Sequence, residues 1–83
     1  MKSKEQLEEK VKKVLGMLPL ADLNVEFEAH RGFKVIAVVT SKQFEKMDEG
    51  DRQHMVWAQL IDHLDPYEQT QVEFVHTMAP SEF

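Results

Sequence analysis

Histidines carry most of the metal-binding chemistry in this chain of 83 residues, which contains four histidines and no cysteine. Without thiolates the chain cannot build a sulfur-ligated zinc or iron–sulfur site on its own. His54 and His63 fall on roughly opposite sides of one predicted helix, so they cannot form an i,i+4 metal pair. His30 lies in a short predicted connector, where an imidazole is exposed and can reach another protein. From the residues alone His30 is an ordinary surface histidine in a turn, and the alternative is an imidazole free to reach a metal site held by another protein.

The remaining histidine, His76, lies in a predicted strand. It has the same parity along that strand as Val72, Phe74 and Met78. Side chains of one parity point to one face of a strand. This pattern predicts a half-buried histidine at the edge of the core rather than a metal ligand.

Three carboxylates, Asp48, Glu49 and Asp51, lie within four residues. They lack the spacing of a calcium-binding loop, and Asp48 or Asp51 is suited to cap the helix that follows. The sequence also shows no Ser-His-Asp arrangement, no paired metal histidines and no glycine-rich phosphate loop. We therefore expect a protein that is not an enzyme.

Bulk composition narrows the classes of partner. The net charge is −5, which disfavours a phosphate backbone because such backbones are bound chiefly by Lys and Arg. No apolar run approaches the ~20 residues that span a bilayer. The charged N-terminal residues do not resemble a secretory signal. We expect a single small domain over residues 1–83, located in the cytoplasm and without a membrane partner.

The basic cluster of Lys10, Lys12 and Lys13 shares a predicted helix with several glutamates. The spacing favours i,i+4 ion pairs such as Glu8–Lys12 on a solvated helix face. We therefore do not interpret the cluster as a nucleic-acid surface.

The first half of the chain predicts a helix and two strands. Apolar residues recur at helical spacing over residues 3–18, after a Ser3–Gln6 capping box and before Pro19. Residues 23–28 alternate as a half-buried strand, and residues 29–32 form a connector whose glycine can take a positive φ. Residues 33–40 are apolar on both parities, which predicts a central strand.

The second half predicts two helices and a third strand. Ser41 is suited to cap a short helix through residue 47. The next helix, capped by Asp51 or Asp48, carries an apolar stripe of Trp57, Leu60, Ile61 and Leu64, and Asp65-Pro66 ends it. A strand follows over residues 72–78. The order α-β-β-α-α-β predicts an α+β fold with a three-stranded mixed sheet and helices on one face, the type II KH-like topology.

Four segments in this order resemble the BolA family, especially its shorter IbaG-like members. FKVIAVV at 33–39 matches a family strand, and FEKM at 44–47 stands where the family has an F-x-G turn. RQHMVW at 52–57 matches the start of a family helix. HTMAPSEF at 76–83 matches the family's strand end and the T-P-x-[EQ]-W segment after it.

The resemblance implies a BolA-like accessory protein that binds a monothiol glutaredoxin in iron–sulfur cluster assembly and iron homeostasis. Such a protein holds no cofactor by itself, as a monomer or weak homodimer. It can share a [2Fe–2S] cluster in which glutaredoxin and glutathione supply sulfur, and here His30 would supply imidazole. The resemblance also implies a partner interface, which comprises Gln71, His76, Ala79, Pro80 and Phe83.

The chain departs from the family pattern at two positions that bear on the cluster. The family's histidine at the start of the third strand is replaced by Thr70 or Gln71, and the histidine of its R-H motif by Gln53. Two alternatives therefore stand beside the cluster-sharing function: a KH-like nucleic-acid-binding regulator, and a partner-binding module that has lost cluster ligation.

Overall fold

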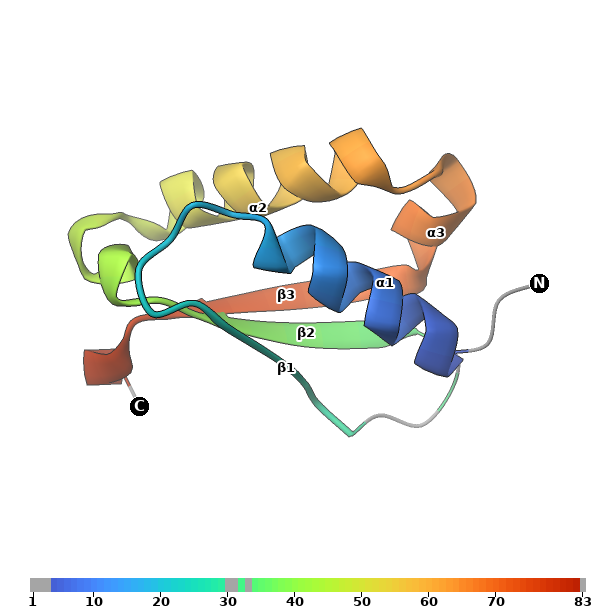
Figure 1. The fold of residues 1–83 in the computed structure, drawn as a ribbon, viewed down its shortest axis with the longest axis horizontal. Coiled ribbons are helices and arrows are strands. Elements are labelled where there is room, and N and C mark those ends of the chain that lie inside the picture. The colour runs from blue at the N-terminus through green and yellow to red at the C-terminus, as the bar shows by residue number, and fades with distance from the viewer. Residues whose placement is uncertain (1–3, 30–31, 33, 83) are drawn as a thin grey trace.

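The computed structural model describes residues 4–29, 32 and 34–82. Within these residues helices pack over one face of a three-stranded sheet (Figure 1). The elements, in chain order, are α1 (Lys4–Gly16), β1 (Asn24–Phe27), β2 (Val35–Thr40), the 3₁₀ turn η1 (Lys42–Lys46), α2 (Glu49–His63), α3 (Pro66–Gln71), β3 (Val72–Met78) and the 3₁₀ turn η2 (Pro80–Glu82).

The strands are ordered β1-β2-β3, with β2 in the centre. β1 pairs antiparallel with β2, and β3 pairs parallel with β2. The predicted α+β fold, a mixed sheet with helices on one face, is confirmed. Gly32, in the connector between β1 and β2, has a φ of 108°, the positive value predicted for a hairpin glycine.

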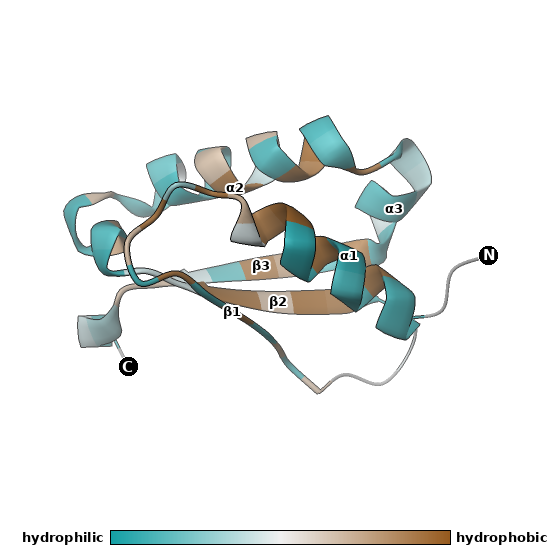
Figure 2. Cartoon of the chain, in the orientation of Figure 1, coloured by the Kyte–Doolittle hydropathy of each residue, from teal (hydrophilic) through white to brown (hydrophobic). Residues whose placement is uncertain are grey.

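The core lies between the helices and the upper face of the sheet. Alternate residues of β2 (Val35, Ala37 and Val39) are fully buried against α1 and α2. Figure 2 shows the same division, because β2 is mostly hydrophobic along its length while the helices alternate hydrophobic and hydrophilic faces. Burying one stripe of each helix against one face of the sheet leaves the other face of the sheet without a helix.

Two residues of the predicted apolar stripe, Leu60 and Leu64, are buried in the core as predicted. The buried row is Arg52, Val56 and Leu60, at i, i+4 and i+8. Trp57 only packs against the margin of the core, and Ile61 is 58% exposed. Ile61, also on the predicted stripe, is therefore outside the core. The buried row begins instead with Arg52, which an apolar pattern does not include because it is charged.

The Asp65-Pro66 pair begins a helix rather than only ending one. Asp65 caps α3 through a full capping box with Glu68, and Pro66 occupies the first turn. The predicted element order missed this helix.

Asp48 is the cap of α2 and accepts a hydrogen bond from the N–H of Asp51. Of the two predicted caps Asp48 is the one used, and α2 begins at Glu49.

A register irregularity changes the parity of β3. Val72 pairs with Val35, but the next pair is Phe74 with Ile36, so Glu73 is an extra residue. After the irregularity Val75 and Thr77 face the core, while Phe74 and His76 face away from it. The predicted common face of Val72, Phe74 and His76 was wrong for this reason.

The basic residues of α1 are arranged differently from the prediction. Lys10 bonds Glu68 of α3, with an Nζ–Oε1 distance of 2.8 Å. Lys12 forms no ion pair with Glu8, although both residues are described. None of the described helices is both long enough and apolar enough to cross a bilayer.

Candidate functional site

The parallel pairing of β2 and β3 brings distant parts of the sequence to one end of the sheet. β1 stops there at Phe27, β2 starts at Val35, and Val72, the first residue of β3, pairs with Val35. We call this the hairpin end. Residues 28–34, which link β1 to β2, include His30, but His30 itself lies outside the described residues.

Gln71, one of the two residues that the resemblance aligns with the family's histidine, lies at the hairpin end. It is the last residue of α3 and precedes Val72 directly. Its side chain is half-buried, and its amide donates only to the hydroxyl of Thr70, over 3.3 Å. No strong hydrogen bond therefore holds this side chain against the domain.

His76 lies on the face of the sheet that has no helix, which we call the open face. Its ring is 41% exposed, its Nε2 lies 3.4 Å from Oε1 of Glu28, and the ring of Phe74 packs edge-on at 4.6 Å between centroids. His76 is half-buried, as predicted, but it faces away from the core. It is therefore accessible to a partner that covers the open face.

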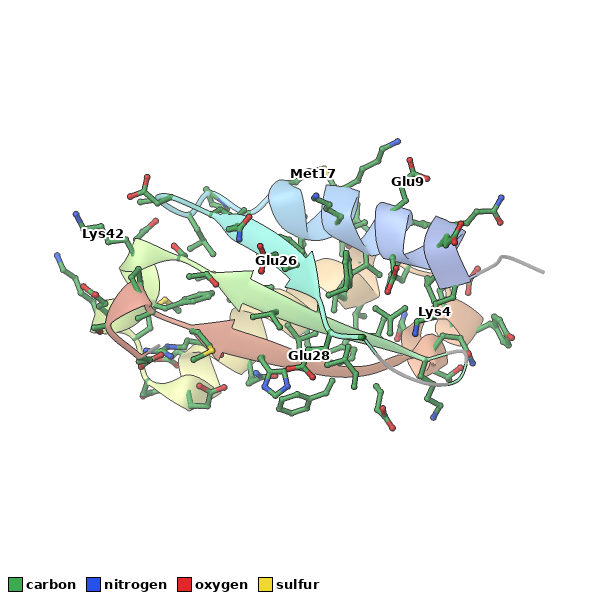
Figure 3. The ribbon with its side chains drawn as sticks, turned by 90° about the horizontal axis from the view of Figure 1, so that it is seen from below. Lys4, Glu9, Met17, Glu26, Glu28 and Lys42 are labelled. Carbon is green, nitrogen blue, oxygen red and sulfur yellow. The ribbon has the colours of Figure 1, made fainter. Side chains whose placement is uncertain are left out.

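The open face is seen in Figure 3, where Glu26 and Glu28 of the β1 side project from it. Strand pairing places three columns of side chains on this face. They are Asn24, Glu26 and Glu28 along β1; Ile36, Val38 and Thr40 along β2; and Phe74, His76 and Met78 along β3. Phe74 is 46% exposed, which leaves an apolar centre beside an acidic margin.

Ala79 and Pro80 lie at the other end of β3, about 20 Å from the hairpin end by strand rise. Figure 1 shows η2 and α3 at opposite ends of the sheet. The Ala79 side chain is fully buried, whereas Pro80 is exposed. Phe83 lies outside the described residues. The predicted interface residues are therefore divided, with Gln71 near the His30 connector and the 79–80 pair far from it.

Arg52 organises that far end. Its Nε donates to the carbonyl of Met47, and its two terminal nitrogens donate to the carbonyls of Phe44 and Thr77 and to both carboxylate oxygens of Glu82. All five guanidinium N–H groups are thus engaged. The group also lies over the Phe44 ring, 5.5 Å from its centroid.

The Arg52–Glu82 pair shifts the acidity of both groups. Hydrogen bonds from Arg52, with a further one from the N–H of Ala79, lower the pKa of Glu82 to about 2. Glu82 in turn raises the pKa of Arg52. The sequence pattern identified Arg52 only as part of a motif, and nothing in the spacing indicated a partner thirty residues away.

The described residues do not hold a metal by themselves. No group of three histidine or carboxylate side chains among them is placed to bind a metal ion, and the chain has no cysteine. His63 is occupied locally, with Nδ1 lying 3.1 Å from the carbonyl oxygen of Gln59.

Comparison with solved structures defines the class of fold. No family model matches the sequence, and no curated protein does. A Bol-like protein from Babesia bovis matches with a TM-score of 0.50 and 24% identity, covering 99% of this chain and 90% of that one. BolA1 from Arabidopsis thaliana matches with a TM-score of 0.50 and 21% identity, covering 100% and 99%.

Both matches extend over essentially the whole domain, including the one-sided mixed sheet. The class is therefore a small α+β domain with a one-sided mixed sheet, and its particular fold is the BolA-like fold.

Proposed function

We propose that this chain is a BolA-like accessory protein that binds a monothiol glutaredoxin and acts in iron–sulfur cluster assembly and iron homeostasis. The fold and the four motif segments support this function together. The observation that carries the proposal is the meeting of two chain segments at the hairpin end, the link that contains His30 and the α3–β3 junction that contains Gln71.

The proposed site works only as half of a shared one. Thiolates from the partner and one imidazole from His30 would together hold a [2Fe–2S] cluster, since imidazole can replace thiolate on one iron. The cluster, when bound, supplies the electron-transfer and iron-storage chemistry. This chain's own contribution is to present His30 and to contact the partner through Gln71 and the neighbouring open face.

Titration with a monothiol glutaredoxin tests the partnership. We expect ¹⁵N–¹H NMR shifts at Gln71 and Glu28, which lie at the hairpin end, and at His76, which contacts Glu28 on the open face. Residues on the outer side of α2, such as Asp62, serve as the internal control. Shifts restricted to α2, or no shifts at millimolar concentrations, would contradict the proposal.

Anaerobic reconstitution of the complex tests the cluster. We expect visible charge-transfer bands that change in the His30→Ala variant, because an iron ligand is removed. His54→Ala removes an exposed histidine from α2 and should leave the bands unchanged. A complex that forms without any such bands indicates a partner-binding module that has lost cluster ligation.

A further inference from the structure

The outer edge of β1 carries backbone groups available for another strand. The N–H of Glu28 bonds the carbonyl of Ile36 at 3.0 Å, which marks Glu28, Glu26 and Asn24 as the residues bonded to β2. The N–H and C=O groups of the intervening Val25 and Phe27 therefore point away from the sheet. Among the described residues, no side chain is hydrogen bonded to them.

Side chains cover backbone carbonyls on the other edge of the sheet, which is β3. On β3 the amide of Gln53 donates to the carbonyl of Val75 over 2.8 Å, and Arg52 donates to the carbonyl of Thr77 over 3.2 Å. These side chains occupy acceptors that an added strand would need. Covering an edge in this way blocks strand addition. Of the two described edges, β1 is the one that remains open to pairing.

A groove runs along the helix side of the β1 edge. Its volume is about 300 Å³, and it lies between the second half of α1 and the beginning of β1. Leu18, Leu20 and Leu23 form its apolar lining, and Lys12 lies at its margin. An added strand would direct the side chain beside Val25 towards this groove, where apolar groups are favoured and the Lys12 ammonium disfavours a cation.

The remaining side chains of an added strand would lie on the open face beside β1. There they meet Glu26 and Glu28, both of which are exposed (Figure 3). Opposite charges in neighbouring strands stabilise a pair, and like charges destabilise it. The acidic column therefore selects Lys or Arg at alternate positions.

The same column argues against a second copy of this chain. An antiparallel β1–β1 contact that bonds Val25 of each copy to Phe27 of the other places Glu26 directly opposite its own copy. Each copy also carries a net charge of −5. Self-pairing along this edge would therefore bring like charges together, both at Glu26 and between the two negatively charged copies.

We propose that the β1 edge accepts, as a fourth strand, an extended segment of another protein in which apolar and basic residues alternate. Main-chain hydrogen bonds to Val25 and Phe27 supply affinity. The leucine-lined groove selects apolar side chains of the bound segment, and the acidic column selects basic ones. This surface meets the hairpin end only at Phe27 and Glu28, and its use does not depend on the proposed glutaredoxin partnership.

A fluorescent peptide of alternating lysine and valine, titrated against the full chain, tests the proposal. We expect saturable binding, with NMR shifts at the amides of Val25 and Phe27. A peptide of the same composition with its lysines and valines in separate blocks is the matched control, because it has the same charge without the pattern. Equal binding of the two peptides, shifts elsewhere only, or no binding at millimolar concentration would overturn the proposal.

Backbone methylation separates strand pairing from simple charge attraction. In an added strand only every second amide faces β1: those of the valines in an antiparallel arrangement, and those of the lysines in a parallel one. Methylating one of these two sets must abolish binding while methylating the other preserves it. Any other outcome overturns strand addition.

Charge reversal tests the acidic column. Glu26→Lys should weaken peptide binding about tenfold, because one cross-strand attraction becomes a repulsion. Asp62→Lys makes the same charge change on α2, where the side chain is 80% exposed, and should leave binding within about twofold. Equal weakening by the two variants would show that the acidic column does not select a basic segment. A dimer in sedimentation experiments that dissociates when the peptide is added would show that a second copy of this chain occupies the edge. Either result would overturn the proposed partner.

Discussion

Gln71 is the residue at which this chain departs most consequentially from the BolA pattern. The sequence located the departure to Thr70 or Gln71, and the structure places Gln71 directly before the first residue of β3 at the hairpin end. Its amide makes one long hydrogen bond to Thr70. The position is therefore suited to a substitution that tests ligation without disturbing the fold.

Gln71→His tests the proposed glutaredoxin complex, in which it should strengthen cluster binding. An imidazole at this position adds a nitrogen ligand where an amide is a poor one, and we expect the cluster bands to persist several-fold longer in air. Thr70→His, one residue earlier on α3, is the matched control and should behave as the wild type. The prediction fails if both variants lose their bands at the wild-type rate, or if the bands persist longer only in Thr70→His.

Arg52 and Glu82 show what residue-level pattern reading misses. A buried arginine with five engaged donors holds η1, α2, β3 and η2 together, yet it appears in the sequence as one more charged residue on a helix. Its acceptors are mostly main-chain carbonyls, which no side-chain spacing reveals. Pairing of this kind depends on the fold, so the sequence predicts it only after the fold is known.

Acid should weaken the domain through Glu82. Its pKa is lowered from 4.5 to about 2 by Arg52 and the Ala79 N–H. Because the folded carboxyl is the stronger acid, its contribution to stability is complete above about pH 4.5 and is lost as the pH falls towards 2. Urea unfolding across this range should show a shallower dependence on pH in Glu82→Gln than in the wild type.

The matched measurement is an NMR titration of the Glu82 carboxyl carbon. A midpoint near 4.5 in the folded protein would contradict the predicted pairing with Arg52, as would identical pH dependence in the two proteins.

At the scale of elements, α3 depends on its capping box. Asp65 accepts from the N–H of Glu68 over 2.7 Å, and Glu68 accepts from the N–H of Asp65 over 3.0 Å. Glu68 is also buried and bonds Lys10, so the short helix is joined to α1. A helix of this length has little stability of its own and relies on such contacts.

Asp65→Ala should lower the free energy of unfolding by about 1 kcal/mol, the usual cost of losing an N-cap side chain. Asp62→Ala removes a carboxylate from the exposed side of α2 and should change stability by less than about 0.5 kcal/mol. Chemical denaturation of both variants measures the difference. Equal losses would show that the capping box does not stabilise α3.

Periodicity predicted the elements that have regular patterns and failed where the pattern is interrupted. The α1 helix follows from helical spacing that ends before Pro19, and β1 from alternation that ends before Gly32. The central place of β2 follows from apolar residues on both of its faces. The α3 helix was missed because Asp-Pro is typical of both a helix end and a helix start. The parity of β3 was missed because the extra residue, Glu73, is specified by pairing with β2.

At the scale of the whole molecule, the sheet has two unlike faces. One is the floor of the hydrophobic core, and the other, the open face, has no helix against it (Figure 1). Phe74 and Val75 are neighbours in β3, but the ring of Phe74 is 46% exposed and Val75 is fully buried. The larger of two adjacent apolar residues therefore contributes less to the core.

Replacing each of these neighbours by threonine compares the two faces directly. Val75→Thr changes almost no volume but places a hydroxyl among apolar groups, and should cost about 2 kcal/mol of unfolding free energy. Phe74→Thr removes a whole ring, yet it keeps a β-forming residue at a half-exposed site. It loses mainly the edge-on contact with His76, so it should cost about 1 kcal/mol or less. Urea denaturation of the two variants measures the order, and a larger loss for Phe74→Thr would show that the open face is covered in solution.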